Sequence, residues 1–234
     1  MKRLGYEVTT APGDRPHYRD VVVLWNRHGQ NDSIARRYEA AGAAVLVSEN
    51  GYLRGGPAYK YETYALARDH HNGAGSWFEG DTNRLSAFGV DLKPWRTDGR
   101  HVLVLPQRGI GEPGVAMPRP WGDMTSRRLR GMTTRPVQLR RHPGRMPQPL
   151  EPDLRDCWAA VTWGSGAAIH AIIAGIPVYY DFPRWIGAPA GKPLADRLEE
   201  PFTGDRLPML QRLVWAEFWP AEIATGESFA RLLQ

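Results

Sequence analysis

Three loops in the second half of the chain carry groups that could hold a phosphate. Gln107-Arg108-Gly109 closes the apolar run 101–107, Arg141-His142-Pro143 closes the run 136–143, and Gly164-Ser165-Gly166 follows the run 158–163. Arginine offers a planar fork that matches phosphate oxygens, and a histidine ring nitrogen can donate a hydrogen bond. A serine at the start of a helix adds its hydroxyl to the free N–H groups and the positive end of the helix dipole.

Each loop also has a simpler structural explanation. A Gly-Ser-Gly turn can serve tight packing alone, and a His-Pro pair often marks only the end of a strand. The three together are more informative, because ligands of open parallel sheets bind beyond the carboxyl ends of the strands. We therefore predict one anion site at this edge, made by a set of nine residues: Gln107, Arg108, Gly109, Arg141, His142, Arg145, Gly164, Ser165 and Gly166.

The elements that must position these loops alternate between strand and helix. Buried strands are expected at 20–26, 43–49, 101–107, 136–143, 158–163 and 175–180, the last of these being the final strand. Helices are expected at 33–41 with Asp32 or Ser33 as N-cap and Gly42 as stop, at 123–132 with Asp123 as cap, at 151–157, and after Ser165. Residues 55–100 read as irregular loop and linker, and the C-terminal region reads as helices broken near Pro220 and Gly226.

This alternation predicts an α/β fold with two Rossmann-like lobes built on parallel sheets. We expect an N-terminal lobe over 1–98, a second, ligand-binding lobe over 99–205, and C-terminal helices over 206–234 that pack back across both.

The second lobe resembles GT-B glycosyltransferases of the capsule-synthesis and Kdo-transferase type. The resemblance covers about residues 101–181 and rests on "VLVLPQR", "QLRRHP" and "VTWGSGAAIHAIIAGIPVYY". It implies that this lobe binds a nucleotide-sugar donor, and we expect a UDP-sugar, with a CMP-sugar as the alternative. The chain is short for two full GT-B lobes, and its first lobe does not match the capsule enzymes closely.

The first lobe instead resembles uncharacterised phage proteins that share the "QRGIG" and "MPRPW" segments. Compact phage glycosyltransferases of this kind imply an acceptor of hydroxymethylated pyrimidines in DNA. A net charge of +5, with 26 arginines among the 30 basic residues, suits such an acceptor, although a GC-rich genome also favours arginine.

Glycosyl transfer also needs a base for the acceptor hydroxyl. Candidates at strand ends of the first lobe are Glu49, Asp32 and His28, in that order, and each could instead be a surface or capping group. No Asp-x-Asp metal motif is present, so we expect no obligatory metal. His70-His71 could form a metal pair, but no carboxylate or cysteine spacing supports it. His170 could face the helix core or a nucleotide.

Three alternative functions remain open. A glycosyltransferase could act on a surface polysaccharide or glycan. A non-catalytic DNA-binding protein would use the "SRRLRGM" and "RPVQLRRHPGR" clusters on phosphates. A histidine phosphatase would use Arg27-His28-Gly29 as its nucleophile loop, although its second histidine is absent from "TWGSG".

Composition restricts the class further. The chain has 234 residues, enough for one large domain or two small lobes. No apolar run approaches the length of a membrane span, and the N-terminus has no apolar signal region. The chain has one cysteine, Cys157, which excludes a disulfide framework and favours a buried structural thiol. We expect a cytoplasmic protein without a membrane partner, and the sequence leaves the oligomeric state open.

Overall fold

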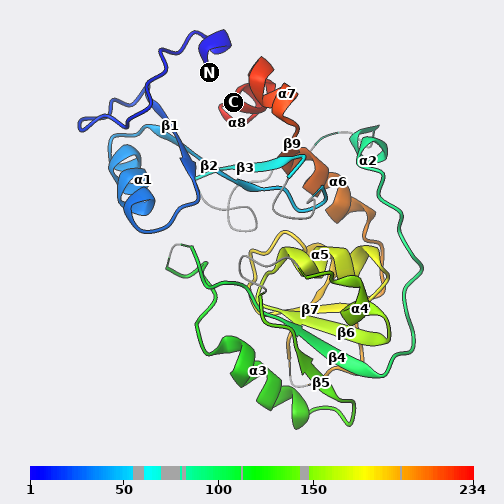
Figure 1. Cartoon of the computed structure of the whole chain (residues 1–234). Helices are drawn as coiled ribbons and strands as arrows, with labels where there is room; N and C mark the ends of the chain where they lie inside the picture. Colours follow the sequence, from blue (N-terminus) through cyan, green and yellow to red (C-terminus); the bar gives the residue numbers. More distant parts are fainter. Residues whose placement is uncertain (55–60, 70–79, 81–82, 112, 143–147, 196) are drawn as a thin grey trace.

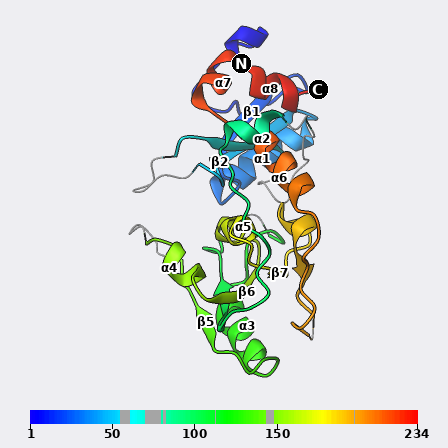
Figure 2. The same ribbon diagram turned by 90° about the vertical axis from the view of Figure 1, so that its right-hand side faces the viewer.

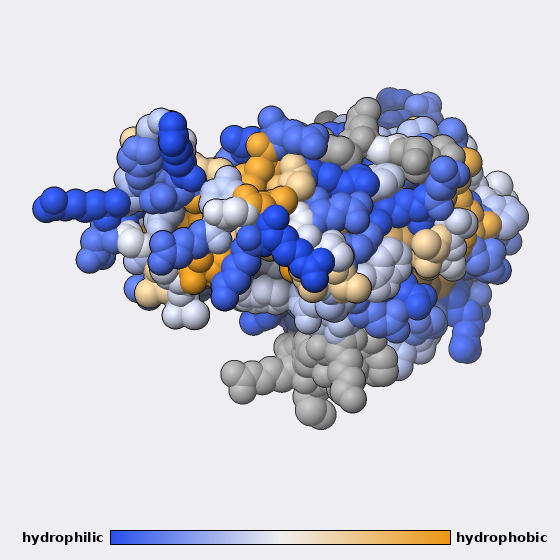
Figure 3. Space-filling view, turned by 90° about the horizontal axis from the view of Figure 1, so that it is seen from above, coloured by the Kyte–Doolittle hydropathy of each residue, from blue (hydrophilic) through white to orange (hydrophobic). Residues whose placement is uncertain are grey.

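The computed structural model describes residues 1–54, 61–69, 80, 83–111, 113–142, 148–195 and 197–234. Two sheets lie one beyond the other along the molecule, in both views of the ribbon (Figures 1 and 2). Both termini lie at the end that carries the first sheet. Seen from that end, the surface is mostly hydrophilic, with small separate hydrophobic areas (Figure 3).

The first sheet has the strand order β1-β2-β3-β9. Strands β1 and β2 are parallel, whereas β3 pairs with both of its neighbours in antiparallel fashion. The bounds of the strands are β1 Val21–Trp25, β2 Ala44–Asn50, β3 Tyr64–Arg68 and β9 Glu217–Phe218. The prediction of a parallel sheet therefore holds for the β1–β2 pair of this lobe and is wrong for the rest.

Two helical layers cover this sheet. Helix α1, Gln30–Ala40, packs on one face, where Val22, Leu24 and Val45 are buried. Helices α7, Pro220–Thr225, and α8, Glu227–Leu232, cover the other face around Leu46 and Leu66.

The second sheet has the strand order β5-β4-β6-β7-β8, and every pair in it is parallel. Its strands are β4 His101–Leu105, β5 Val137–Leu139, β6 Cys157–Thr162, β7 Val178–Tyr180 and β8 Lys192–Pro193. Strands β4 and β6 are fully buried, as expected for continuous apolar runs covered on both faces. The predicted α/β fold with a parallel sheet is confirmed here.

Helices lie on both faces of this sheet. Helix α3, Trp121–Arg130, covers one face, while α4, Glu151–Leu154, and α5, Gly166–Ile173, cover the other. Helix α5 lies at the end of the second sheet that faces the first (Figures 1 and 2).

The chain crosses between the sheets twice. It leaves the first lobe through α2, Asn83–Ala87, and a long segment that leads to β4, and it returns through α6, Leu207–Ala216 (Figure 1). Helix α6 buries Met209, Leu210 and Leu213 in the core cluster that also contains α5. Tyr52 and Leu53 of the first lobe pack against this same cluster, so the core continues from one lobe into the other.

Several predicted boundaries are wrong for identifiable reasons. Helix α1 begins at Gln30, three residues before the predicted start, because Gly29 adopts a φ of +57° and turns the chain directly into the helix. Asp32 and Asp123 lie in the first turns of α1 and α3 instead of capping them.

Two regions contain more regular structure than the sequence suggested. The stretch 55–100 contains β3 and α2 in addition to loop and linker. Two short strands, β8 and β9, follow the predicted final strand. At β5 the reverse holds, because among the described residues 136–142 of the predicted strand only Val137, Gln138 and Leu139 pair with β4.

Candidate functional site

The carboxyl ends of β4 and β6 are joined by side-chain hydrogen bonds. Gln107, after β4, donates from its Nε2 to the carbonyl oxygen of Gly164, after β6, at 2.6 Å. The hydroxyl of Thr162 donates to the carbonyl oxygen of Leu105 at 2.8 Å and accepts from the N–H of Ser165 at 2.8 Å. The first and third predicted loops therefore meet at this edge.

Ser165 is the N-cap of α5, as the sequence predicted. Its backbone is extended, with φ −73° and ψ 144°, and its Oγ accepts from the N–H of Ala167 at 3.3 Å. One free N–H of the first turn is satisfied in this way, and the rest of the turn keeps the positive end of the helix dipole. The turn is thus suited to an anion.

The two glycines beside Ser165 have a packing role. A Cβ on Gly166 would lie 3.0 Å from Cδ1 of Tyr52, and one on Gly164 would lie 3.2 Å from Cδ1 of Trp185. Each glycine therefore lets an aromatic ring approach the backbone. The packing explanation accounts for these two positions, and the contact at Gly166 comes from the first lobe.

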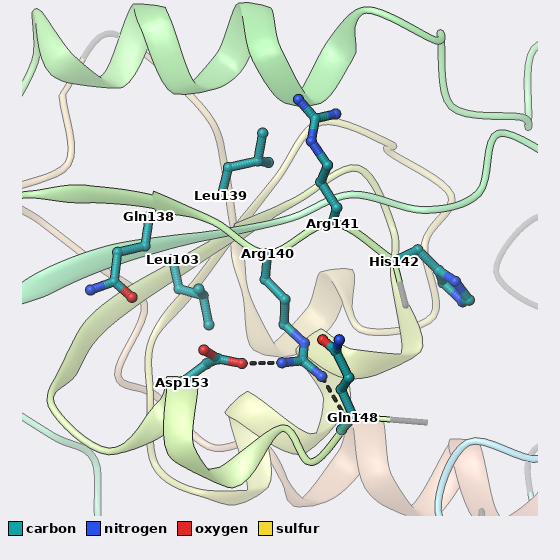
Figure 4. Close-up of a pocket in the computed structure, with 8 residues that line it drawn as sticks. All are labelled: Leu103, Gln138, Leu139, Arg140, Arg141, His142, Gln148 and Asp153. Carbon is teal, nitrogen blue, oxygen red and sulfur yellow. Dashed lines mark hydrogen bonds and ion pairs between the residues drawn. The ribbon is translucent and has the colours of Figure 1, made fainter. Parts of the chain in front are cut away.

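A cavity of about 420 Å³ lies at the carboxyl end of β5 (Figure 4). The guanidinium of Arg140 points between Asp153, with which it forms an ion pair, and the carbonyl oxygen of Gln148, which it contacts at 2.7 Å. Arg141 points the opposite way, toward α3, and donates to Oδ1 of Asp123 at 2.8 Å. The cavity is lined by Leu103, Gln138, Leu139, Arg140, Arg141, His142, Gln148 and Asp153.

His142 connects this cavity to the loop after β4. Burial lowers the pKa of its imidazole, and the positive charges of Arg108 and Arg140 lower it further. Arg108 and His142 thus lie close enough to interact, as the sequence predicted. Arg145 lies outside the described residues, as do His70 and His71.

Tyr52 links the first lobe to the carboxyl-end edge of the second sheet. Its hydroxyl donates to Oε1 of Glu49, at the end of β2, at 3.0 Å. Burial, together with the negative charges of Glu49 and Glu217, raises the pKa of the Tyr52 phenol well above its usual value. The backbone carbonyl of Tyr52 accepts a hydrogen bond from the ring of His170 on α5, and burial lowers the pKa of this histidine. Tyr52 therefore contacts both the first-ranked candidate base, Glu49, and Gly166 at the N-terminus of α5.

The loop after β1 is occupied by internal ion pairs. Arg27 is only 4 % exposed and donates to Oδ1 of Asp32 at 2.9 Å and to Oε2 of Glu39 at 2.9 Å. Burial by itself raises the pKa of Asp32, but hydrogen bonds from Arg36 and Arg27 outweigh it and lower that pKa. Asp32 is thus a weak base that neutralises Arg27, and Arg27 is not free to hold the phosphate that a histidine phosphatase requires. His28 is exposed beside this network.

Other arginines also stabilise the fold instead of contacting a ligand. Arg84 donates to the carbonyl oxygen of Val214 and pairs with Glu222, among the rings of Phe88, Trp215, Phe218 and Trp219. Arg96 donates to the carbonyl oxygens of Leu154 and Cys157, each at 2.8 Å. Arg206 donates to the carbonyl oxygen of Ile172, at the end of α5, at 2.6 Å. The high arginine content therefore does not by itself indicate phosphate contacts.

Sequence reasoning missed three residues of this region: Tyr52, Arg140 and Glu217. Glu217 lies on β9 and is fully buried, and its carboxylate accepts hydrogen bonds from the backbone of Tyr52 and Leu53. A charged residue inside an apolar helical pattern could have marked it, because a buried carboxylate needs several donors.

No three His, Cys, Asp or Glu side chains among the described residues are grouped so as to hold a metal ion. None of the helices in that part of the chain is long and apolar enough to cross a membrane.

Comparison with known proteins places this geometry in a known fold. No family model and no curated protein matches the chain. Among solved structures, the β-Kdo 2,7-transferase of Thermosulfurimonas dismutans KpsC is similar with a TM-score of 0.55 and 13% identity, over 92% of this chain and 85% of that one. The β-Kdo 2,4-transferase of the same KpsC is similar with a TM-score of 0.54 and 12% identity, over 87% and 82%. The chain therefore shares the fold of Kdo transferases, and the predicted resemblance to this type of glycosyltransferase is confirmed at the level of fold.

Proposed function

We propose that the protein is a glycosyltransferase that uses a nucleotide-sugar donor. The observation that carries this proposal is the contact made by Tyr52, which joins the candidate base Glu49 to the N-terminus of α5. A base and an anion site facing each other across two lobes are the two groups that glycosyl transfer requires. The shared fold with two Kdo transferases supports the same class of reaction.

In this proposal the second lobe holds the donor. The first turn of α5, with Ser165, and the side chains of Arg108 and His142 interact with the donor phosphates as negative charge develops on them. Gln107 fixes the Gly164 carbonyl, so the turn is already organised before the donor binds. The fold neighbours act with Kdo, which raises a CMP-activated donor above the UDP-sugar that the sequence suggested.

The first lobe, over residues 1–98, holds the acceptor. Glu49 takes the proton from the acceptor hydroxyl as its oxygen bonds to the sugar's anomeric carbon. The bond between that carbon and the donor phosphate breaks, and the nucleotide leaves with the phosphate. Asp32 is not proposed as this base, because its ion pairs with Arg27 and Arg36 lower its pKa and make it a poor proton acceptor.

Two acceptor classes follow from different observations. The fold neighbours favour a sugar hydroxyl of a glycan. Hydroxymethylated pyrimidines in DNA agree with the net charge of +5. We place the glycan first on the basis of the fold.

Transfer assays with a matrix of donors and acceptors test the proposal. The donors are CMP-Kdo, UDP-glucose and UDP-galactose, and the acceptors are a Kdo-terminated oligosaccharide and DNA with plain cytosine, 5-hydroxymethylcytosine or 5-hydroxymethyluracil. Mass spectrometry detects the added sugar, and Glu49→Gln serves as the matched inactive variant.

The outcomes separate the hypotheses. A mass gain on the oligosaccharide supports the glycan acceptor, and a gain on one modified base supports the DNA acceptor. Salt-sensitive DNA binding by a protein that neither binds nor turns over any donor would contradict the proposal and support a non-catalytic DNA-binding protein.

A further inference from the structure

The carboxylate of Glu217, on β9 of the first sheet, is fully buried. Its Oε1 accepts from the N–H of Tyr52 at 2.7 Å and from the N–H of Leu53 at 3.0 Å. Its Oε2 accepts from the hydroxyl of Thr63 at 2.8 Å. A buried carboxylate with three donors holds their positions firmly, because every lost hydrogen bond would leave a polar group unsatisfied away from water.

The turn over residues 51–53 is shaped around this carboxylate. A Cβ on Gly51 would lie 2.7 Å from Oε2 of Glu217 and 2.3 Å from the hydroxyl oxygen of Thr63, so a larger residue cannot occupy this position. The N–H of Gly51 donates to the carbonyl oxygen of Thr63 at 3.0 Å, which ties the turn to the segment leading into β3.

The same residue is anchored from the C-terminal side. Strand β9 pairs Glu217 with Ala65 of β3, and the carbonyl oxygen of Glu217 accepts a hydrogen bond from Arg84. Arg84 in turn pairs with Glu222 at the start of α7. The position of the carboxylate is therefore set by β3, α2 and the C-terminal helices together.

We propose that Glu217 is a positioning residue for the transfer reaction. Its carboxylate fixes the 51–53 turn, so that the Tyr52 ring lies against Gly166 and the Tyr52 hydroxyl orients Glu49. This inference rests on the proposed function for its catalytic consequence. Glu217 does not touch the reacting atoms and acts through Tyr52.

Hydrogen exchange measured by mass spectrometry, combined with transfer kinetics, tests this role. In Glu217→Ala we expect exchange at the amides of Tyr52 and Leu53 to accelerate at least tenfold, while that of β4 stays unchanged. We expect kcat to fall at least tenfold and the Kd of the donor to stay within twofold. Glu217→Gln keeps an oxygen for both amides and is expected to restore protection and most of kcat.

The control is Glu62→Gln, which changes an exposed carboxylate next to Thr63 and is expected to alter neither measurement. If Glu217→Ala loses protection throughout the chain, the variant has unfolded and cannot test the role. Thr63→Val then serves as the test, because it removes only one hydrogen bond from the same carboxylate. Faster exchange at 51–53 with a two- to fivefold lower kcat supports the role.

Unchanged protection at Tyr52 and Leu53 in Glu217→Ala would overturn the inference, and so would lost protection with unchanged kcat. If the wild-type protein transfers no sugar, the proposed function fails. The exchange result then still decides whether Glu217 holds the turn.

Discussion

The facing edges of the two sheets carry opposite chemistry. At the edge of the first sheet, the carboxylates of Glu49 and of the buried Glu217 accept hydrogen bonds from Tyr52. The edge of the second presents the cation of Arg108, the imidazole of His142 and the N–H groups at the start of α5. Under the proposed function, the first edge supplies the proton acceptor and the second supplies the phosphate site, and each can be altered separately.

The sharpest test of this division is Glu49→Gln. A general base contributes roughly 100- to 10,000-fold to the rate, so kcat should fall by at least about 100-fold. The Kd of the donor should not change, since the substitution lies on the acceptor side. Transfer assays stopped at fixed times measure kcat, and calorimetric titration with the donor measures its Kd. A weaker donor Kd with unchanged kcat would place Glu49 in the donor site instead.

The buried carboxylate of the first edge makes stability depend on pH. Burial raises the pKa of Glu217 to about 7 from 4.5, although Thr63, the amides of Tyr52 and Leu53, and Arg84 lower it in part. Between these two values the folded protein holds a proton that the unfolded chain has released. The stabilisation is therefore complete below pH 4.5 and is lost as the pH rises through 7.

The shift corresponds to roughly 3 kcal/mol across that window. Urea unfolding at several pH values measures it as the difference between the wild-type protein and Glu217→Gln. A difference that does not change between pH 4.5 and 8 would mean that Glu217 is ionised throughout.

Asp32→Asn distinguishes two possible roles of Asp32, as the ion-pair partner of Arg27 and as the catalytic base. The change weakens the support of buried Arg27, and we expect the free energy of unfolding to fall by about 2 kcal/mol. Transfer activity per folded molecule should stay within twofold of the wild type. A 100-fold loss of kcat at full stability would return Asp32 to the position of base.

Arg108→Ala tests the second edge. Loss of one charge-assisted hydrogen bond to a donor phosphate should weaken donor binding about tenfold. Arg119→Ala, an exposed arginine that precedes α3, is the matched control and should leave the Kd unchanged. Equal effects of both variants would indicate a diffuse positive field instead of a specific contact.

Ser165→Ala should give the smallest effect on stability. Removing the N-cap of α5 costs about 1 kcal/mol. If Ser165 also binds the donor, Ser165→Ala will weaken the Kd of the donor in addition to lowering the free energy of unfolding. A change in thermal unfolding without any change in donor affinity would restrict Ser165 to capping.

The sequence predicted the second edge better than the first. Continuous apolar runs and a serine N-cap are local signals, so β4, β6 and the start of α5 could be recognised directly. The first edge depends on contacts between distant residues, because Glu217 meets Tyr52 across 165 positions of the chain. No local pattern records such a contact.

The roles of charged residues are hard to predict for a related reason. The sequence leaves Arg27 and Asp32 open as ligand-binding, catalytic or capping groups, and the fold pairs them with each other. Strand β9 was hidden for a different reason, since two residues between helices leave no periodicity to detect.

The thiol of Cys157 gives the molecule a practical property. The chain has one cysteine, and burial raises the pKa of its thiol to about 12. At pH 8 roughly one molecule in ten thousand carries the thiolate, which is the form that alkylating reagents attack. Two cysteines, one introduced on each lobe, could therefore be labelled with a pair of fluorescent dyes for energy-transfer measurements, with no other change to the chain. The native cysteine would stay unlabelled and add no background fluorescence. The distance between the lobes could then be followed as candidate substrates are added.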